Sequence, residues 1–209
     1  MSKYIGPKCK LCRREGDKLM LKGERCSTAK CAIVKRNYPP GLHGPKGRAR
    51  QSGYNMQLRE KQKAKRIYNL MEKQFALSFA RAIKQKGEAG ENLMKILETR
   101  LDNVIYRLGF AASRAEARTL TNHGHFTVND KKVNIPSFNV KTGDIIKIKK
   151  ASRTSKKFAS LSEKLKKVEI PGWLNLDIKD LSAKVLGQPA KENFESKINS
   201  QMIVEFYSK

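Results

Sequence analysis

Four cysteines, all within the first 31 residues, are the side chains best suited to bind a metal ion in this chain of 209 residues. Cys9 and Cys12 form a C-x-x-C pair, and Cys26 and Cys31 form a second, wider pair. Four thiolates suit a tetrahedral Zn²⁺ and leave no open position for a catalytic water, so we expect a structural zinc site. An iron–sulfur cluster is the alternative metal centre, and buried or redox-active thiols are the alternative without metal.

The residues between the two cysteine pairs predict a short hairpin, as in a zinc ribbon. Leu19 and Leu21 alternate with Met20 and a lysine, while Gly16 and Gly23 could turn the chain on either side. We therefore expect a compact metal knuckle over residues 1–45.

Positive charge dominates the composition. Lys and Arg number 45 against 19 Asp and Glu, a formal net charge of +26, and residues 1–66 alone hold 19 basic and 4 acidic side chains. Such a surplus weakens a compact protein by self-repulsion unless a polyanion neutralises it. Nucleic acid is the expected partner. No segment reaches the roughly 20 apolar residues that span a bilayer, and no apolar leader is visible, so we expect a cytoplasmic protein with no membrane partner.

Two further basic segments follow the cysteines. Residues 37–55 are rich in Gly and Pro and predict an extended loop that could follow a phosphate backbone, with a flexible linker as the alternative. Residues 58–87 predict one helix whose apolar residues recur every four positions from Ile67 to Ile83. The many cations of the loop and of the first helical turns favour RNA contact: Lys46, Arg48, Arg50, Arg59, Lys61, Lys63, Lys65 and Arg66.

Residues 101–148 predict two helices packed on a small antiparallel sheet, which is an α+β arrangement. Leu101, Val104, Ile105 and Leu108 have the spacing of a buried helix face, and Gly109 suits the end of that helix. Alternating residues then predict strands that begin with Phe126-Thr127-Val128, turn at Asn129-Asp130, and continue through Ile146 and Ile148.

The second of these helices should begin at Ser113, because Glu116 completes a capping box with it. Ala117 and Leu120 would point inward. The opposite face should then point outward and contact RNA, with solvated arginines as the alternative; it carries Arg114, Arg118 and Asn122.

The stretch "RLDNVIYRLGFAASRAEARTLTNHGHFTVNDKKVNIPSF" resembles the RNA-binding module named after the fourth protein of the small ribosomal subunit. "YIGPKCKLCRREG", "YPPGLHG", "LREKQKAKRIY", "PGWLNLD" and "IVEFYSK" extend the resemblance to that ribosomal protein family along the whole chain, in its cysteine-bearing form. The resemblance implies that the second helix and the hairpin of the module bind RNA, which adds His123 and Lys131 to Arg114, Arg118 and Asn122.

The resemblance also implies the domain layout and the biological role. A cysteine segment (1–45) would precede a helical domain (46–98), which the C-terminal residues 180–209 complete, with the RNA-binding module (99–179) inserted between. The protein would bind small-subunit ribosomal RNA, nucleate assembly of its 5′ domain and contribute to decoding accuracy. Its neighbours would be other ribosomal proteins, small-subunit protein five among them, and messenger RNA at the entry path.

Two other classes of protein compete with this interpretation. The same module occurs in pseudouridine synthases, whose catalytic Asp lies in an Arg-Leu-Asp string like Arg100-Leu101-Asp102. Leu101 belongs to the predicted core face, however, and no room remains for a catalytic domain, so we expect no enzyme. A zinc-ribbon regulator of DNA is the third class, but no helix-turn-helix or tandem finger is visible.

Overall fold

The computed structural model describes residues 4–46, 52–159, 161–166 and 168–208. The chain divides into two compact units, one formed by Met1–Leu93 with Glu195–Lys209 and the other by Met94–Phe194. Helix α5 (Ala89–Glu98) runs across the first boundary. Within the described residues, no helix has the length and apolar character needed to cross a membrane.

The first unit is helical in its described part. Helix α1 (Lys8–Glu15), the 3₁₀ helix η1 (Gly23–Ser27), α2 (Ala32–Lys35) and η2 (Gly44–Lys46) precede α3 (Gly53–Ile67) and α4 (Glu72–Ile83). The hairpin predicted between the cysteine pairs is therefore wrong. Leu19 and Leu21 are both buried, because Met20 between them adopts a positive φ of 51° that breaks the alternation of a strand.

The single helix predicted over residues 58–87 is two helices. Asn69 has a left-handed φ of 54° and occupies the position after the cap of α3, where Asn is one of the few residues that tolerates this conformation. The N–H of Leu70 donates to the carbonyl of Lys65 at 2.9 Å, and the N–H of Asn69 donates to that of Arg66 at 3.1 Å. This pair of bonds closes the helix, so Met71 and Ile83 leave the predicted apolar stripe and are exposed.

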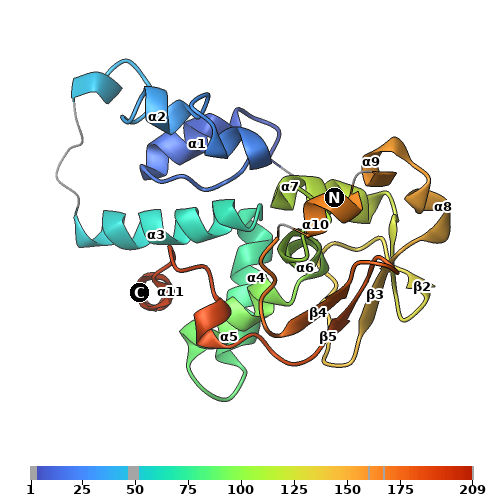
Figure 1. Cartoon of the computed structure of the whole chain (residues 1–209). Coiled ribbons are helices and arrows are strands. Elements are labelled where there is room, and N and C mark those ends of the chain that lie inside the picture. Colours follow the sequence, from blue (N-terminus) through green and yellow to red (C-terminus); the bar gives the residue numbers. More distant parts are fainter. Residues whose placement is uncertain (1–3, 47–51, 160, 167, 209) are drawn as a thin grey trace. The chain divides into compact units, whose positions relative to one another are not determined.

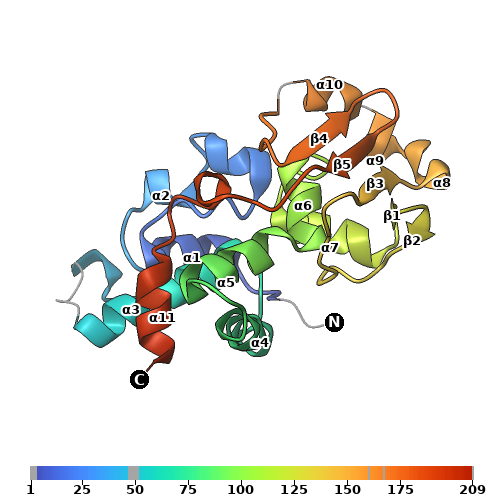
Figure 2. The same ribbon diagram turned by 90° about the horizontal axis from the view of Figure 1, so that it is seen from below.

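The C-terminal helix α11 (Ser200–Tyr207) packs across α3 in this unit (Figure 2). Tyr207 stacks on Phe79 with ring centroids 4.4 Å apart, and Phe206 lies 5.6 Å from Tyr54. Ile203 is fully buried. The structure groups Glu195–Lys209 with the helical first unit, whereas the family resemblance implied residues 180–209.

The second unit is an α+β structure. Helices α6 (Leu101–Arg107) and α7 (Arg114–Asn122) pack against one face of a five-stranded antiparallel sheet (Figure 1). The strands are β1 (Phe126–Val128), β2 (Lys131–Lys132), β3 (Ile145–Ile148), β4 (Leu174–Asp177) and β5 (Ser182–Val185), in the spatial order β2-β1-β3-β5-β4. The α+β prediction is confirmed. Short helices α8 (Lys150–Arg153), α9 (Lys156–Ala159), α10 (Leu161–Leu165) and the 3₁₀ helix η3 (Lys191–Asn193) complete the unit.

The sheet is larger than the sequence predicted, and this changes the domain boundary. Strand β5 pairs with β3, with Ala183 opposite Ile146, so both belong to one sheet. The second unit accordingly continues to Phe194, whereas the sequence predicted that the module ends at residue 179. Strand β5 was missed because its side chains, such as Lys184, carry little of the β-branched and aromatic signal of a strand.

Local signals in this unit were predicted correctly. Gly109 has a positive φ of 78° at the end of α6. The Ser113 hydroxyl accepts from the N–H of Glu116 at 3.3 Å. The carboxylate of Glu116 accepts from Ala112, one residue before the predicted partner of the capping box. The turn at Asn129 and Asp130 has positive φ at both residues, 49° and 62°, as the tightest hairpin turn requires.

The strained turn generates a prediction. Replacing Asp130 with Gly should raise the free energy of unfolding by about 0.5 kcal/mol, because Gly adopts positive φ without steric cost but adds entropy to the unfolded chain. The change also removes an exposed ion pair between Lys147 and Asp130, which is worth little. Urea unfolding measures the difference. Asp130→Ala is the control, since it removes the same ion pair and keeps the strain. Equal stability of the two variants would contradict the account.

Candidate nucleic-acid interface

The four cysteines line one small cavity of about 20 Å³. Cys9 and Cys12 lie one turn apart on α1, Cys26 lies in η1, and Cys31 precedes α2. All four are free thiols. Such a volume corresponds to about one small sphere of water size. The described residues contain no group of three or more Cys, His, Asp or Glu side chains that lie close enough together to hold a metal ion.

Burial and a backbone hydrogen bond shift the pKa of the Cys12 thiol in opposite directions. Burial raises the pKa of the Cys12 thiol, and the three neighbouring sulfurs raise it further, whereas a hydrogen bond from the backbone of Leu19 lowers it. The N–H of Lys22 also donates to the Cys26 Sγ at 3.3 Å. Amide donors of this kind favour the thiolate form that a metal requires.

The cations of helix α3 that the sequence offered for RNA contact are paired with carboxylates of this unit. Arg59 and Arg66 both bind the carboxylate of Glu15, whose side chain is only 2% exposed. Burial raises the pKa of Glu15 in spite of these two arginines. Lys63 pairs with Asp17 at 3.4 Å and with Glu60 at 3.2 Å. The contacts of Glu15 join α1 to α3.

A second carboxylate joins α4 to α3. Glu72 accepts from Lys61 and, at 2.8 Å, from Lys65. Lys61 is itself buried, and its ammonium lies 4.7 Å from the centroid of Phe206. Burial would raise the pKa of Glu72, but the hydrogen bonds from Lys61 and Lys65 outweigh it and hold the pKa below the ordinary value. Of the loop cations predicted with this group, Lys46 is exposed, while Arg48 and Arg50 lie outside the described residues.

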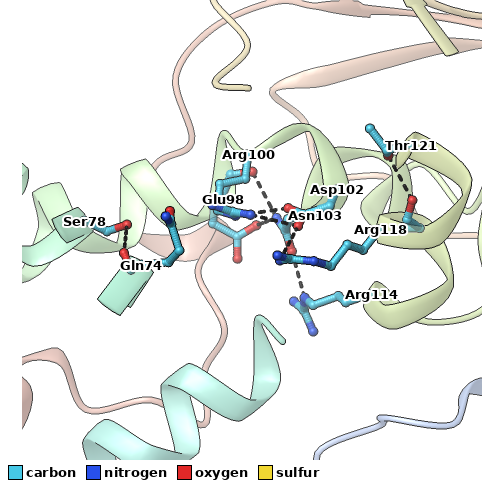
Figure 3. A network of polar contacts seen from close by, with 10 residues as sticks. Gln74, Ser78, Glu98, Arg100, Asp102, Asn103, Arg114, Arg118 and Thr121 are labelled. Carbon is cyan, nitrogen blue, oxygen red and sulfur yellow. Dashed lines mark hydrogen bonds and ion pairs between the residues drawn. The ribbon is translucent and has the colours of Figure 1, made fainter. Parts of the chain in front are cut away.

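The outward-facing position predicted for Arg114 and Arg118 is wrong. They are only 7% and 3% exposed and lie in a polar network between α6 and α7 (Figure 3). The Arg114 Nε donates to the Asn103 Oδ1 at 2.7 Å, and its guanidinium lies 4.5 Å from the centroid of the Tyr106 ring. An Arg118 nitrogen lies 3.5 Å from the Asp102 Oδ2. Burial lowers the pKa of Arg118, and Asp102 opposes that effect.

The network continues through α6 to the end of α5. Arg100 binds both carboxylate oxygens of Asp102, at 3.0 and 2.8 Å. Glu98 is fully buried and accepts from Arg107 at 2.7 and 3.0 Å and from Asn103 at 2.7 Å. Since each buried carboxylate accepts hydrogen bonds from side chains on more than one turn, the network fixes how the helices pack.

Exposed polar residues remain at the end of α7 and on the adjoining hairpin. Asn122, His123 and Lys131 are all exposed, so the structure leaves these three predicted residues accessible to a ligand. The sequence missed lysines on the face of the sheet opposite the core. Lys132 and Lys147 both pair with Thr127 from neighbouring strands. The alternation of β3 could have revealed Lys147, but Lys184 lies on β5, which was not predicted.

The fold and the accessible cations define a basic, two-unit α+β protein of the nucleic-acid-binding class. A family model described as "Ribosomal protein S4/S9 N-terminal domain" matches residues 3–98, and one described as "S4 domain" matches residues 99–146. The chain is 56% identical over 209 residues to "Small ribosomal subunit protein uS4" of Caldicellulosiruptor saccharolyticus, with 100% of both chains covered. It is 54% identical, with the same coverage, to the protein of that name in Clostridioides difficile. The chain belongs to the small ribosomal subunit protein uS4 family.

The buried network predicts a large effect on stability. Asp102→Asn should lower the free energy of unfolding by about 3–5 kcal/mol, because Arg100 and Arg118 would lose the carboxylate that neutralises them in a buried site. Urea unfolding, followed by circular dichroism, measures the loss. Asp180→Asn is the control, since it removes an exposed carboxylate of the same unit. A loss no larger than that of the control would show that the network does not stabilise the unit.

The lowered pKa of Glu72 predicts that the free energy of unfolding depends on pH. Its pKa is lowered in the folded protein, so its stabilising effect is present above the unfolded value of about 4.5 and is lost as the pH falls through the folded pKa. Glu72→Gln should therefore destabilise at neutral pH, by only about 0.5–1 kcal/mol because the side chain is 47% exposed. The difference should vanish on acidification. Urea titrations at neutral pH and at a pH below the folded pKa of Glu72 test this, with Glu163→Gln as an exposed control. A difference that persists in acid would contradict it.

Proposed function

We propose that this protein is a structural component of the small ribosomal subunit that binds small-subunit ribosomal RNA directly. The observation that carries the proposal is its full-length similarity to proteins named uS4. The net charge of +26 supports a polyanionic partner. In this role the protein nucleates assembly of the 5′ domain, contributes to translational accuracy and remains ribosome-bound in the cytoplasm. Its neighbours are small-subunit protein five and the messenger RNA at its entry path.

In this proposal the residues of the second unit divide into two roles. Asn122, His123 and Lys131 contact RNA, because they are exposed where α7 ends and the hairpin begins. Arg114 and Arg118 are positioning residues, since their contacts with Asn103 and Asp102 hold α7 against α6. A rigid helix end and hairpin can then recognise RNA by its shape, which A-form grooves favour over direct reading of bases.

The proposed mode of action is binding and not catalysis. Asp102, the candidate nucleophile in the pseudouridine synthase alternative, is only 3% exposed. Both of its oxygens are held by Arg100, and Arg118 lies beside one of them. A nucleophile must reach the substrate and must not be neutralised by two guanidinium groups.

We also propose that Cys9, Cys12, Cys26 and Cys31 hold one structural metal ion, zinc before an iron–sulfur cluster. The four cysteines line one cavity of about 20 Å³, and backbone amides already donate to two of the sulfurs. Binding requires the thiols to rotate toward the shared cavity and to lose their protons. The metal would cross-link α1 to the segments that follow it and supply no catalytic chemistry.

The metal proposal predicts one ion per chain in freshly purified protein, measured by elemental analysis. Cys9→Ser should lower the metal content and increase proteolysis within residues 8–35, because metal binding and local folding are coupled. Residues 94–194 should keep their resistance to protease. Ser27→Ala, in the same segment, is the control. Metal well below one ion per chain, together with four titratable thiols, would contradict the proposal.

The RNA-binding proposal is tested by equilibrium binding to small-subunit ribosomal RNA over a range of salt concentrations. Lys131→Ala should weaken binding by about 1.5–3 kcal/mol, because it removes a charge-assisted contact to phosphate. The slope of log affinity against log salt should become shallower by about one unit. Lys141→Ala removes another exposed charge from the same unit and should change both quantities little. Wild-type protein that shows no preference for this RNA over duplex DNA would overturn the proposal.

A further inference from the structure

Arg13 of helix α1 holds the Gly- and Pro-rich loop that follows α2. The Arg13 Nε donates to the carbonyl of Tyr38 at 3.0 Å, and its Nη2 donates to the carbonyl of Pro39 at 3.2 Å. The guanidinium also lies 4.7 Å from the centroid of the Tyr38 ring, which is within the range of a cation–π contact. A planar guanidinium can donate two hydrogen bonds and stack on a ring at the same time, whereas the ammonium of a lysine is a point charge.

Backbone hydrogen bonds extend this hold along the loop to Lys46. The N–H of Gly44 donates to the carbonyl of Gly41, and the N–H of Lys46 donates to that of His43, both at 3.2 Å. The loop also closes on itself at Gly44, because a Cβ atom added there would lie 1.9 Å from the carbonyl oxygen of Pro39. The carbonyl that accepts the second arginine hydrogen bond therefore touches the turn that ends at Lys46.

The loop has little apolar packing of its own. Of residues 37–46, which the structure describes in full, only Gly44 is buried. Leu42, near the middle of the loop, is 89% exposed. Since burial of side chains does not fix the loop, its shape depends on the contacts with Arg13 and on the turn at Gly44.

The charge of the chain around the loop favours an anionic ligand. Residues 25–59 contain eight Lys and Arg and no Asp or Glu. Lys35, Arg36 and Lys46 are exposed. A surface segment of this composition attracts phosphate groups, and RNA is the phosphate polymer that the proposed function supplies.

We propose that Arg13 is a positioning residue for RNA binding, which holds residues 38–46 in the shape that brings Lys46 to an RNA phosphate. Arg13 acts through the carbonyls of the loop and does not itself touch the phosphate. The inference rests on the proposed function and deepens it, because it assigns the ordering of an RNA-contacting loop to a residue of α1. A loop that is ordered before binding loses less conformational entropy when RNA binds, so the hold raises the affinity.

A double-mutant cycle tests the positioning role in the full chain, with small-subunit ribosomal RNA as the probe at one fixed salt concentration. Lys46→Ala alone should weaken binding about tenfold, because it removes one charge-assisted contact to phosphate. Arg13→Ala alone should weaken binding by at least as much. In the Arg13→Ala background, Lys46→Ala should weaken binding by less than about twofold, because the loop no longer brings this lysine to the phosphate.

Two further variants separate loop shape from charge. Arg13→Lys keeps the charge but loses the forked contact, so it should behave as Arg13→Ala does. Gly44→Ala distorts the loop without removing a charge, and it should also suppress the effect of Lys46→Ala. Arg81→Ala is the control, since it removes an exposed arginine from α4 of the same unit and should leave the effect of Lys46→Ala unchanged. Circular dichroism should show native helix content for every variant.

Additive effects of Arg13→Ala and Lys46→Ala would overturn the inference, because they would reveal two independent contacts with phosphate. Unchanged affinity of either single variant would also overturn it. Wild-type protein that still binds this RNA in those cases would show that the inference fails while the proposed function stands. Wild-type protein that does not bind the RNA would overturn both.

Discussion

The surplus of positive charge is the constraint on which the rest of this structure depends. With 45 basic and 19 acidic residues, the chain has few carboxylates, and three of them, two of which are buried, each serve two cations. Glu15 holds Arg59 and Arg66, Glu72 holds Lys61 and Lys65, and Asp102 holds Arg100 and Arg118. In each case the carboxylate joins residues from two helices or from two turns. The local charge balance and the helix packing therefore depend on the same contacts, because a buried cation is tolerated only with its partner.

This division of charge separates the basic residues that build the fold from those available to a ligand. Buried arginines such as Arg114 and Arg118 act through neighbouring side chains, and exposed residues such as Lys131 can meet an RNA phosphate directly. Since the remaining surplus repels itself, binding of a polyanion should also stabilise the folded state. A protein with this charge distribution is suited to assembly with RNA, in which folding of the protein and folding of the RNA support one another.

The parts of the fold that the sequence predicted are those fixed by neighbouring residues. The start of α7 at Ser113, the end of α6 at Gly109 and the turn at Asn129-Asp130 each follow from a few adjacent side chains. The parts it missed depend on distant partners. Arg118 is buried because Asp102, sixteen positions earlier, neutralises it, and helical spacing alone cannot reveal this. Strand β5 exists because β3 and β4 border it on both sides. The cysteines could be grouped from their spacing, but the helical conformation around Cys9 and Cys12 could not be predicted from it.

Contacts with RNA should hold this protein on the small ribosomal subunit. Co-sedimentation of the purified protein with small subunits that lack it, before and after a high-salt wash, measures this directly. One copy should bind per subunit and stay bound through the wash, because specific contacts persist when non-specific electrostatic binding is screened. Complete loss of the protein in the wash, or binding of many copies per subunit, would show that the protein has no specific site on the subunit.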